Sequence, residues 1–485
     1  MKEGSHEKKY WCICKECQGQ GIKRRRISKK VRLSYQLAYC EFEKTKGESE
    51  IPNRPVGEVY SCNICNGSGL IKSDTPPKVE KEKFPHVSII GGGIGGVALA
   101  VACFHRGIPF TLYERDKNFN ARSQGYGLTL QQASRAIEGF GIFSLKDGVV
   151  STKHIVHNSE GEVIGEWGMR RWVSSDSNLT SKRSNVHIAR QSLRSVLLQQ
   201  LEGNESVKWG HQLVDFEEAE NDNIILKFIV NGEIKYNKTN LLVGADGIRS
   251  SVRRLLFGDS VDSLRYLDCM VILGICSLSA LEDIKSSLLD SATVFQTTNG
   301  QERIYIMPYS VDSVMWQLSF PISEEKAKNL SLQGPKVLKE EACRRTQWHS
   351  PIPQILEATT ENQISGYPVY DRTLLNPALL KCSKQVTLLG DAAHPMSPFK
   401  GQGANQALLD ALSLARGISK GCNSSNWRDV GIRKSVLSNY EEEMLSRSAI
   451  KVKDSASAAK FLHSKIILFK GDKPRGSFSK FKDDI

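Results

Sequence analysis

Two hydrophobic patterns alternate along much of the chain. Apolar runs of four or five residues at 86–90 and 110–113 are typical of buried strands, and the longer apolar run at 97–104 between them predicts a helix. The order strand, turn, helix returns at 241–253 and at 386–416. Strands that alternate with helices in this way indicate a parallel sheet in an α/β domain.

A β-rich region interrupts this order. Strand-like runs lie at 303–308 and 314–320, and the pattern becomes helical from about residue 425, through 436–445 to 461–468. A chain of 485 residues with 40% apolar residues can form two or three domains with a substantial core. We therefore expect a second, β-rich domain interleaved with the α/β domain, followed by a helical segment.

Glycines occupy the turn after the first strand, in the sequence Gly-Gly-Gly-Ile-Gly-Gly at 91–96. Gly91 allows the tight turn, Gly93 allows the backbone to approach a pyrophosphate, and Gly96 allows the helix to pack closely on the strand. Glu114 ends the next strand, at the separation expected for a carboxylate that holds an adenosine ribose. Such glycines alone also occur in ordinary tight turns, but this context predicts a dinucleotide site for FAD or NAD rather than a 2′-phosphorylated cofactor.

Two later turns distinguish between these dinucleotides. Asp246 lies in Gly-Ala-Asp-Gly at 244–247, and Asp391 lies in Gly-Asp-Ala-Ala at 390–393, each after an apolar strand. A carboxylate in the second turn can accept hydrogen bonds from ribityl hydroxyls, and the helix at 407–416 directs its positive end toward the flavin ring. The three turns in this order therefore predict FAD bound in an extended conformation.

The same three turns resemble those of the single-component FAD-dependent aromatic-ring monooxygenases, the p-hydroxybenzoate hydroxylase type, and in particular the branch that includes tetracycline-inactivating monooxygenases. Residues 390–410 are the most specific part of a resemblance that covers about 86–470. Arg122 and Arg190 match family arginines near the cofactor, although a surface arginine and a helix-face ion pair are alternative interpretations. The cofactor-binding residues that the resemblance implies are Gly91, Gly93, Gly96, Glu114, Arg115, Arg122, Arg190, Asp246, Asp391, Gly403 and Asn405.

The resemblance also implies an activity. In this family a nicotinamide cofactor reduces FAD, dioxygen adds at flavin C4a to form a hydroperoxide, and one oxygen atom is transferred to an electron-rich ring. We therefore expect an NAD(P)H-dependent FAD monooxygenase that hydroxylates an aromatic or polyketide-like small molecule. No catalytic acid–base pair is predicted, and His394, which follows the turn at 390–393, is expected to order that loop.

Cysteines form a separate pattern near the N-terminus. Cys14 and Cys17, and again Cys62 and Cys65, stand in two copies of Cys-x-x-Cys-x-Gly-x-Gly. Two such pairs can complete a tetrahedral zinc site, with glycine N–H groups supporting the sulfurs. The repeat resembles the cysteine-rich zinc domain of the DnaJ chaperones, and two repeats imply one zinc ion. Cys12 as a substitute ligand and a redox dithiol are the alternatives.

The same region carries much of the net charge of +13. Residues 23–32 include seven basic side chains, and up to Pro85 there are 18 Lys and Arg against 11 Asp and Glu. This composition favours either a protein or nucleic-acid partner or a solvated hairpin kept soluble by its charge. Two alternative functions follow: a flavin monooxygenase acting on a protein or RNA delivered by the zinc module, and a non-catalytic zinc-containing adaptor.

Neither a membrane span nor a secretion signal is expected. Residues 1–9 are charged throughout, and the longest apolar stretch, 87–104, contains the dinucleotide glycines. Twelve cysteines in a chain of this length do not indicate a secreted disulfide scaffold. We therefore expect a cytoplasmic protein.

The expected fold class is α/β: a Rossmann-like FAD-binding domain interleaved with a β-rich substrate domain, with a C-terminal helix and a small N-terminal zinc-binding module. The boundaries we predict are 1–72 for the zinc module, 73–85 for a linker, 86–151, 185–261 and 367–420 for the FAD-binding domain, 152–184 and 262–366 for the substrate domain, and 421–475 for a bridging C-terminal helix.

Overall fold

The structure is a computed structural model that divides into two compact units, Met1–Lys78 and Val79–Ile485. Each unit is described by itself. Among the described residues, no helix is both long enough and apolar enough to cross a membrane. The described residues are 10–45, 51–121, 126–168, 185–219, 223–258, 263–424, 426–472 and 474–475.

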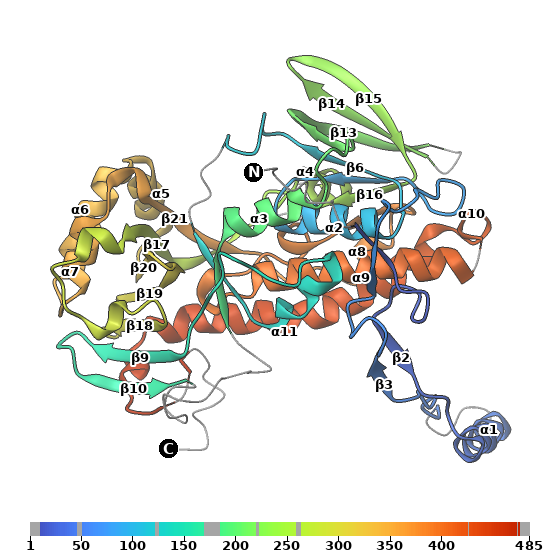
Figure 1. The fold of residues 1–485 in the computed structure, drawn as a ribbon, viewed down its shortest axis with the longest axis horizontal. Helices are drawn as coiled ribbons and strands as arrows, with labels where there is room; N and C mark the ends of the chain where they lie inside the picture. Colours follow the sequence, from blue (N-terminus) through green and yellow to red (C-terminus); the bar gives the residue numbers. More distant parts are fainter. Residues whose placement is uncertain are drawn as a thin grey trace, which may run out of the picture. The chain divides into compact units, whose positions relative to one another are not determined.

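The first unit contains two short antiparallel ladders and one helix (Figure 1). Strand β1 pairs with β4, and β2 pairs with β3. Helix α1 buries none of its residues, so the buried centre of the unit is formed by cysteines. The bounds are β1 Tyr10–Ile13, β2 Ile22–Arg24, α1 Lys29–Lys44, β3 Val59–Ser61 and β4 Leu70–Ser73.

A five-stranded parallel sheet lies at the centre of the FAD-binding part of the second unit, as the alternating pattern predicts. Its order is β12-β6-β5-β16-β22, so β5, which precedes the first glycine turn, is the middle strand. All pairs in this sheet are parallel. The bounds are β5 Val87–Ile90, β6 Phe110–Glu114, β12 Val207–Trp209, β16 Leu241–Gly244 and β22 Val386–Leu388.

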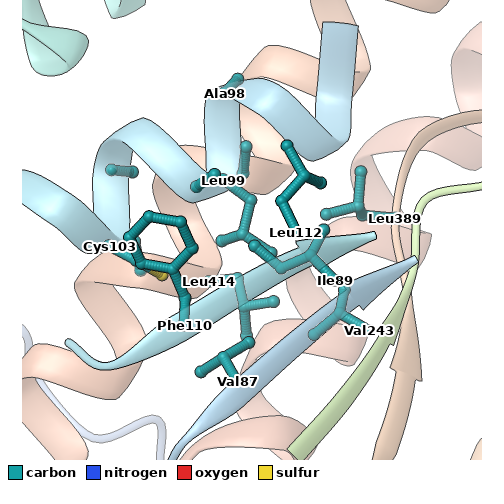
Figure 2. Packing of buried hydrophobic residues seen from close by; sticks show 14 of the residues in the cluster. Val87, Ile89, Ala98, Leu99, Cys103, Phe110, Leu112, Val243, Leu389 and Leu414 are labelled. Carbon is teal, nitrogen blue, oxygen red and sulfur yellow. The ribbon is translucent and has the colours of Figure 1, made fainter. Parts of the chain in front are cut away.

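The larger hydrophobic core joins this sheet to two helices, α2 (Ile94–His105) and α9 (Gly403–Ser424). Ile89 of β5 and Leu112 of β6 lie beneath Leu99 of α2 (Figure 2). Every residue of α2 except Phe104 is buried, because the sheet covers one side of the helix and α9 packs against another. This explains why the sequence of α2 is a continuous apolar run rather than an amphipathic pattern.

A seven-stranded sheet forms the substrate part of the second unit, in the order β10-β9-β18-β19-β20-β17-β21. All its pairs are antiparallel except β9 with β18. Helices α5, α6 and α7 cover one face, where Trp316, Leu318 and Ile304 are buried (Figure 1). The bounds are β9 Lys153–Asn158, β10 Val163–Trp167, β17 Arg265–Ser277, β18 Thr293–Thr298, β19 Arg303–Ser310, β20 Ser313–Pro321, β21 Ile364–Asp371, α5 Glu324–Leu332, α6 Pro335–Arg345 and α7 Ile352–Ala358.

Two smaller sheets complete the second unit. One has the order β7-β11-β8, and the other is the antiparallel meander β13-β14-β15. The remaining helices are short except for α11, which packs along α9 (Figure 1). The bounds are β7 Gly127–Leu130, β8 Val149–Val150, β11 Val186–Ala189, β13 His211–Ala219, β14 Asn223–Val230, β15 Glu233–Thr239, α3 Arg190–Gln199, α4 Ser251–Phe257, α8 Pro377–Leu380, α10 Trp427–Val430 and α11 Ser438–Leu462.

The element bounds differ from the predicted boundaries in two places. The boundary at 367 falls inside β21, a strand of the substrate sheet, because the sequence pattern does not show where a strand changes domain. Residues 79–85 of the predicted linker belong to the second unit, since Phe84 is buried and the Trp427 indole donates to the Lys83 carbonyl at 3.0 Å. The predicted bridge lies in α11, whose end reaches the substrate sheet through a 2.9 Å hydrogen bond between His463 and Ser319.

Candidate active site

The first glycine turn is crowded at Gly91 and Gly96 but not at Gly93, at the start of α2. A Cβ on Gly91 would lie 2.6 Å from the Ala245 carbonyl oxygen, and one on Gly96 would lie 1.9 Å from the Gly91 carbonyl oxygen. At Gly93, by contrast, the nearest atom to a Cβ would be Arg190 Nη2 at 3.7 Å. The N–H groups of the first helical turn have no partners within the helix, so this space suits a pyrophosphate.

Glu114 lies beside this turn because β6 neighbours β5 in the sheet. Its two carboxylate oxygens accept hydrogen bonds from the backbone N–H groups of Gly92, at 2.7 Å, and Asp116, at 2.9 Å. These bonds fix the carboxylate at the edge of the glycine turn, where a ribose would follow a pyrophosphate. The neighbouring Arg115 is exposed. Ribose binding by Glu114 and cofactor binding by Arg115 stay predictions.

Two arginines of α3 lie on the same side of that helix, four residues apart. Arg190 is close to Gly93, and its guanidinium lies 5.2 Å from the centre of the Tyr126 ring. Arg194 is buried between two aromatic rings and donates to the Gly92 carbonyl oxygen at 2.7 Å. Sequence analysis missed Arg194, although its spacing from Arg190 was a usable signal. Arg122 lies outside the described residues.

The second turn is tied to the third by an arginine. Asp246 accepts hydrogen bonds from the Ser250 hydroxyl at 2.5 Å and the Ser251 N–H at 2.7 Å, so its carboxylate caps the start of α4. Burial raises the pKa of Asp246 although these hydrogen bonds oppose the shift. Arg253 of α4 donates to the carbonyl oxygens of Ala392 and Ala393, at 3.1 and 2.9 Å. The turns at 244–247 and 390–393 are therefore held together directly.

A buried network fixes the third turn from behind. Asp410 of α9 accepts hydrogen bonds from the Gly390 N–H at 2.9 Å, His394 Nε2 at 2.7 Å and Arg447 Nη2 at 2.8 Å. Desolvation acts to lower the pKa of His394, but attraction to Asp410 raises it overall. His394 therefore orders the loop next to Asp391, in the position expected from its place in the sequence.

Asp391 and Tyr126 lie close to each other. Both side chains are reached by solvent, Tyr126 with 39% of its surface exposed, yet desolvation by the surrounding protein raises the pKa of each. Attraction to Arg190 opposes this rise in the pKa of both groups, so the three side chains lie close together.

The start of α9 is also part of this site. A Cβ on Gly403 would lie 3.5 Å from an Asp391 carboxylate oxygen. The side chain of Asn405 is fully engaged within the protein: it accepts from the N–H groups of Gln131 and Ala133 and donates to two carbonyls, with all four distances between 2.9 and 3.1 Å. Cofactor binding by Asn405 stays a prediction, and its side chain joins α9 to the segment after β7.

The face of the substrate sheet opposite helices α5, α6 and α7 contacts the FAD-binding part. The Gly127 N–H contacts Met315 Sδ at 3.0 Å, and a Cβ on Gly127 would lie 2.5 Å from Met307 Cε. Further along the sheet, Phe399, six residues after the third turn, packs against a buried cluster with Tyr367. The substrate sheet therefore approaches the FAD-binding part next to Tyr126.

The four predicted metal ligands converge in the first unit. Their sulfur atoms all lie within 4.8 Å of one another, with Cys17 and Cys65 at 3.7 Å and Cys14 and Cys62 at 4.0 Å. The N–H groups of Gly21 and Gly69 each donate to a cysteine sulfur at 3.2 Å. Zinc bound tetrahedrally at about 2.3 Å requires sulfurs about 3.8 Å apart, so this buried cluster fits a zinc ion.

Comparison with known proteins identifies the family of the second unit. Residues 85–448 match the profile of a family described as "FAD binding domain". The aurachin C monooxygenase/isomerase of Stigmatella aurantiaca is 29% identical over 338 residues, which cover 69% of this chain and 80% of that protein. A chloroplastic zeaxanthin epoxidase from an Oncidium hybrid is 27% identical over 386 residues, covering 77% of this chain but only 55% of that protein.

Solved structures show the same fold. The Klebsiella pneumoniae HpxO protein in complex with FAD and uric acid has a TM-score of 0.65 at 20% identity, covering 80% of this chain and 92% of that one. A tetracycline destructase has a TM-score of 0.55 at 17% identity, covering 79% of this chain and 92% of that one. At these identities the likeness concerns the fold alone, so the tetracycline branch and the DnaJ-type module stay predictions.

The residues of the three turns fit FAD, since the open space at Gly93, the accessible Asp391 and the start of α9 follow one another along a single site. The matched profile covers three quarters of the chain and includes all three turns. The chain therefore belongs to the FAD-binding domain family and is an FAD-dependent monooxygenase, an oxidoreductase.

Proposed function

We propose that this chain uses NAD(P)H and dioxygen to hydroxylate an aromatic or polyketide-like small molecule. The observation that carries the proposal is the solvent-accessible pair Asp391 and Tyr126, beside the point where Gly127 contacts Met315 of the substrate sheet. Bound FAD, reduced by the nicotinamide cofactor, supplies the activation of dioxygen. Tyrosine and methionine side chains on the facing sheet suit a flat, apolar ring.

The residues of this chain have positioning roles in this reaction. Arg194 and Arg253 donate to carbonyl groups of the first and third glycine turns, so they hold the backbone of these turns in place. The Asp410 network fixes the backbone next to Asp391, the residue proposed to bind ribityl hydroxyls. Met307 and Met315 give the substrate sheet an apolar surface on the side of the candidate active site, which excludes water from the reacting ring.

The proposal is tested by following NADPH oxidation by FAD-loaded protein in air, with and without a panel of phenols and tetracyclines. Products are scored by mass, and NADH is compared with NADPH. The expected result is stimulated oxidation coupled to a product that is heavier by one oxygen atom. Oxidation that yields only hydrogen peroxide with every compound would contradict hydroxylation of this substrate class. Protein freed of FAD is the matched control and should oxidise no NADPH.

We propose further that Cys14, Cys17, Cys62 and Cys65 bind one zinc ion. The spacing of the sulfurs and the two glycine N–H donors support this assignment. In the described part of the first unit, Leu70 is the one buried hydrophobic residue besides these cysteines, so the metal would supply the stability that so few apolar residues cannot. Elemental analysis of protein purified without added metal should find one zinc per chain; a metal-free protein with an intact first unit would contradict it.

A second candidate function is supported by α1. This helix exposes Val31, Leu33 and Leu37 and overlaps the end of the basic segment 23–32, a combination that favours a macromolecular partner. In this alternative the zinc module delivers a protein or RNA to the flavin site. Nucleic acid that copurifies with the full chain and is lost when residues 23–26 are made neutral would support it over a free small-molecule substrate.

A further inference from the structure

A cavity of about 810 Å³ lies between α11 and the segment that follows β21. This volume is within the range of about 300–1,000 Å³ that is usual for small-molecule sites. Its walls are formed by residues 372–377 and Lys381, by one side of α11 from Ser438 to Val452, and by His394. None of these lining residues belongs to the three glycine turns or to the start of α9, so the cavity is separate from the FAD site.

Much of the cavity wall is apolar. Leu375, Leu445 and Val452 are buried residues that line it, and Leu374 lines it with 41% of its surface exposed. The neutral polar residues of the wall are Thr373, Asn376, Ser438, Ser446 and Ser448. A wall with apolar surface and a few polar groups is typical of sites that bind a ligand by its apolar body and orient it by hydrogen bonds.

The buried charged side chains of the wall are directed to partners within the protein. Arg372 donates to the Ile248 carbonyl oxygen at 2.7 Å, and Glu441 forms an ion pair with Arg433 at 2.7 Å. Two further charged residues of the wall, exposed and of opposite sign, are Lys381 and Glu442. A charged ligand would lose its hydration in this cavity without gaining a buried counter-ion, which is costly. The wall therefore favours an uncharged ligand.

His394 adds one hydrogen-bonding group to the cavity. Its side chain lines the cavity, yet only 4% of the residue is exposed. Nε2 is bonded to Asp410 at 2.7 Å, whereas Nδ1 has no hydrogen-bond partner among the described residues. A buried polar atom without a partner costs free energy, and a polar atom of a ligand in the cavity could pair with it.

The same histidine connects the cavity to the third glycine turn. His394 and Arg447 both donate to Asp410, which also accepts from the Gly390 N–H. Arg447 lies on the part of α11 that lines the cavity, between two lining serines. A ligand that packs against His394 and against this part of α11 would restrict both side chains. It would thereby stabilise the carboxylate that holds the third turn.

We propose that this cavity binds a small, uncharged and largely apolar molecule with one hydrogen-bonding group, and that its occupancy strengthens FAD binding. The ligand class follows from the apolar wall, the paired charges and the free Nδ1 of His394. The effect on FAD follows from the shared contact of His394 and Arg447 with Asp410. The proposal does not depend on which substrate the enzyme hydroxylates, because it concerns ligand binding and FAD retention only.

The test uses the ethyl ester of coumarin-3-carboxylic acid, a flat uncharged probe with carbonyl acceptors, and compares it with the free acid. Dissociation constants are measured by calorimetry on FAD-loaded protein without NADPH. One ester should bind per chain, and the charged acid should bind about tenfold more weakly or worse. Ala449→Phe fills the cavity and should weaken ester binding about tenfold or more. Ile450→Phe, at a neighbouring position that is 60% exposed, is the matched control and should leave ester binding unchanged.

The second measurement is the rate at which diluted, FAD-loaded protein releases flavin into an ultrafiltrate. Saturating ester should slow this release about fivefold or more in wild type and in Ile450→Phe, but not in Ala449→Phe. Ser446→Phe replaces Ala449→Phe if that variant does not retain FAD. The proposed site is overturned if the ester does not bind or if its binding survives the cavity-filling change. Equal affinity for the acid overturns the ligand class, and FAD release that bound ester does not slow overturns the coupling.

Discussion

The buried carboxylate of Asp410 offers the sharpest test of how the flavin turn is held. It is completely buried and accepts from Gly390, His394 and Arg447 at 2.9, 2.7 and 2.8 Å. Asp410→Asn preserves the shape of the side chain but removes its charge and replaces one acceptor oxygen by an NH₂ group. At least one of the three donors then faces another donor, and the charge on Arg447 loses its buried partner.

The magnitude follows from these contacts. Removing one partner of a buried ion pair costs about 3–5 kcal/mol, so the free energy of unfolding of Asp410→Asn should fall by that amount. The measurement is urea unfolding followed by circular dichroism. Glu443→Gln is the matched control: this carboxylate also contacts Arg447, at 2.7 Å, but its side chain is 48% exposed, so the loss should be at most about 1 kcal/mol. A loss at Asp410 no larger than at Glu443 would refute the reasoning.

The same pair predicts a pH dependence. Desolvation acts to lower the pKa of His394, but Asp410 raises it overall; desolvation acts to raise the pKa of Asp410, but His394 and Arg447 lower it overall. Stability from His394 is present below its unfolded pKa, about 6.5, and is lost as the pH rises through the folded value. Stability from Asp410 is present above its unfolded pKa, about 3.9, and is lost as the pH falls through the folded value. The difference in stability between wild type and Asp410→Asn should therefore be largest between these limits, and a difference that did not change with pH would contradict the coupling.

Three further substitutions test the remaining sites. Gly96→Ala places a Cβ 1.9 Å from the Gly91 carbonyl oxygen, and such overpacking costs about 1–3 kcal/mol. The purified variant should therefore retain less FAD, measured by absorbance at 450 nm. Full retention of FAD would contradict the crowding argument. Arg194→Lys should weaken FAD binding by about 1–3 kcal/mol in calorimetry, because a lysine cannot both stack between two rings and reach the Gly92 carbonyl. An unchanged affinity for FAD would exclude a role of Arg194 in holding the first glycine turn. Cys62→Ser should abolish zinc in elemental analysis without loss of FAD, whereas Cys40→Ser, at an exposed thiol, should keep both; zinc retained by Cys62→Ser would rule out the four-cysteine site.

The sequence predicts those parts of the site whose chemistry is local. The glycine turn before α2 and the carboxylate of Asp391 each follow a strand within a few residues, so strand, turn and function can be read together. The cysteine cluster is predictable for the same reason, since each pair lies within one Cys-x-x-Cys-x-Gly-x-Gly repeat, although 48 residues separate the two pairs. In these cases the residue type and its neighbours determine the geometry.

The supporting contacts could not be predicted in this way. Arg253 reaches Ala392 across 139 residues, and Arg194 reaches Gly92 across 102 residues. Apart from the spacing of Arg194 from Arg190, the local sequence of α3 and α4 does not distinguish these buried arginines from surface ones, because their partners are backbone carbonyls, which every residue has.

These arginines explain a feature of the turns themselves. A loop that binds an anion has to present its N–H groups to the ligand, and its carbonyl oxygens then point elsewhere and need donors. Arg194 supplies donors to the first turn and Arg253 to the third, each from behind the loop. A guanidinium suits this role better than an ammonium, because it is always charged and holds its donors in a fixed plane. The positive charges behind the turns also favour the negative charge of a bound dinucleotide, so the arginines that order these loops also favour cofactor binding.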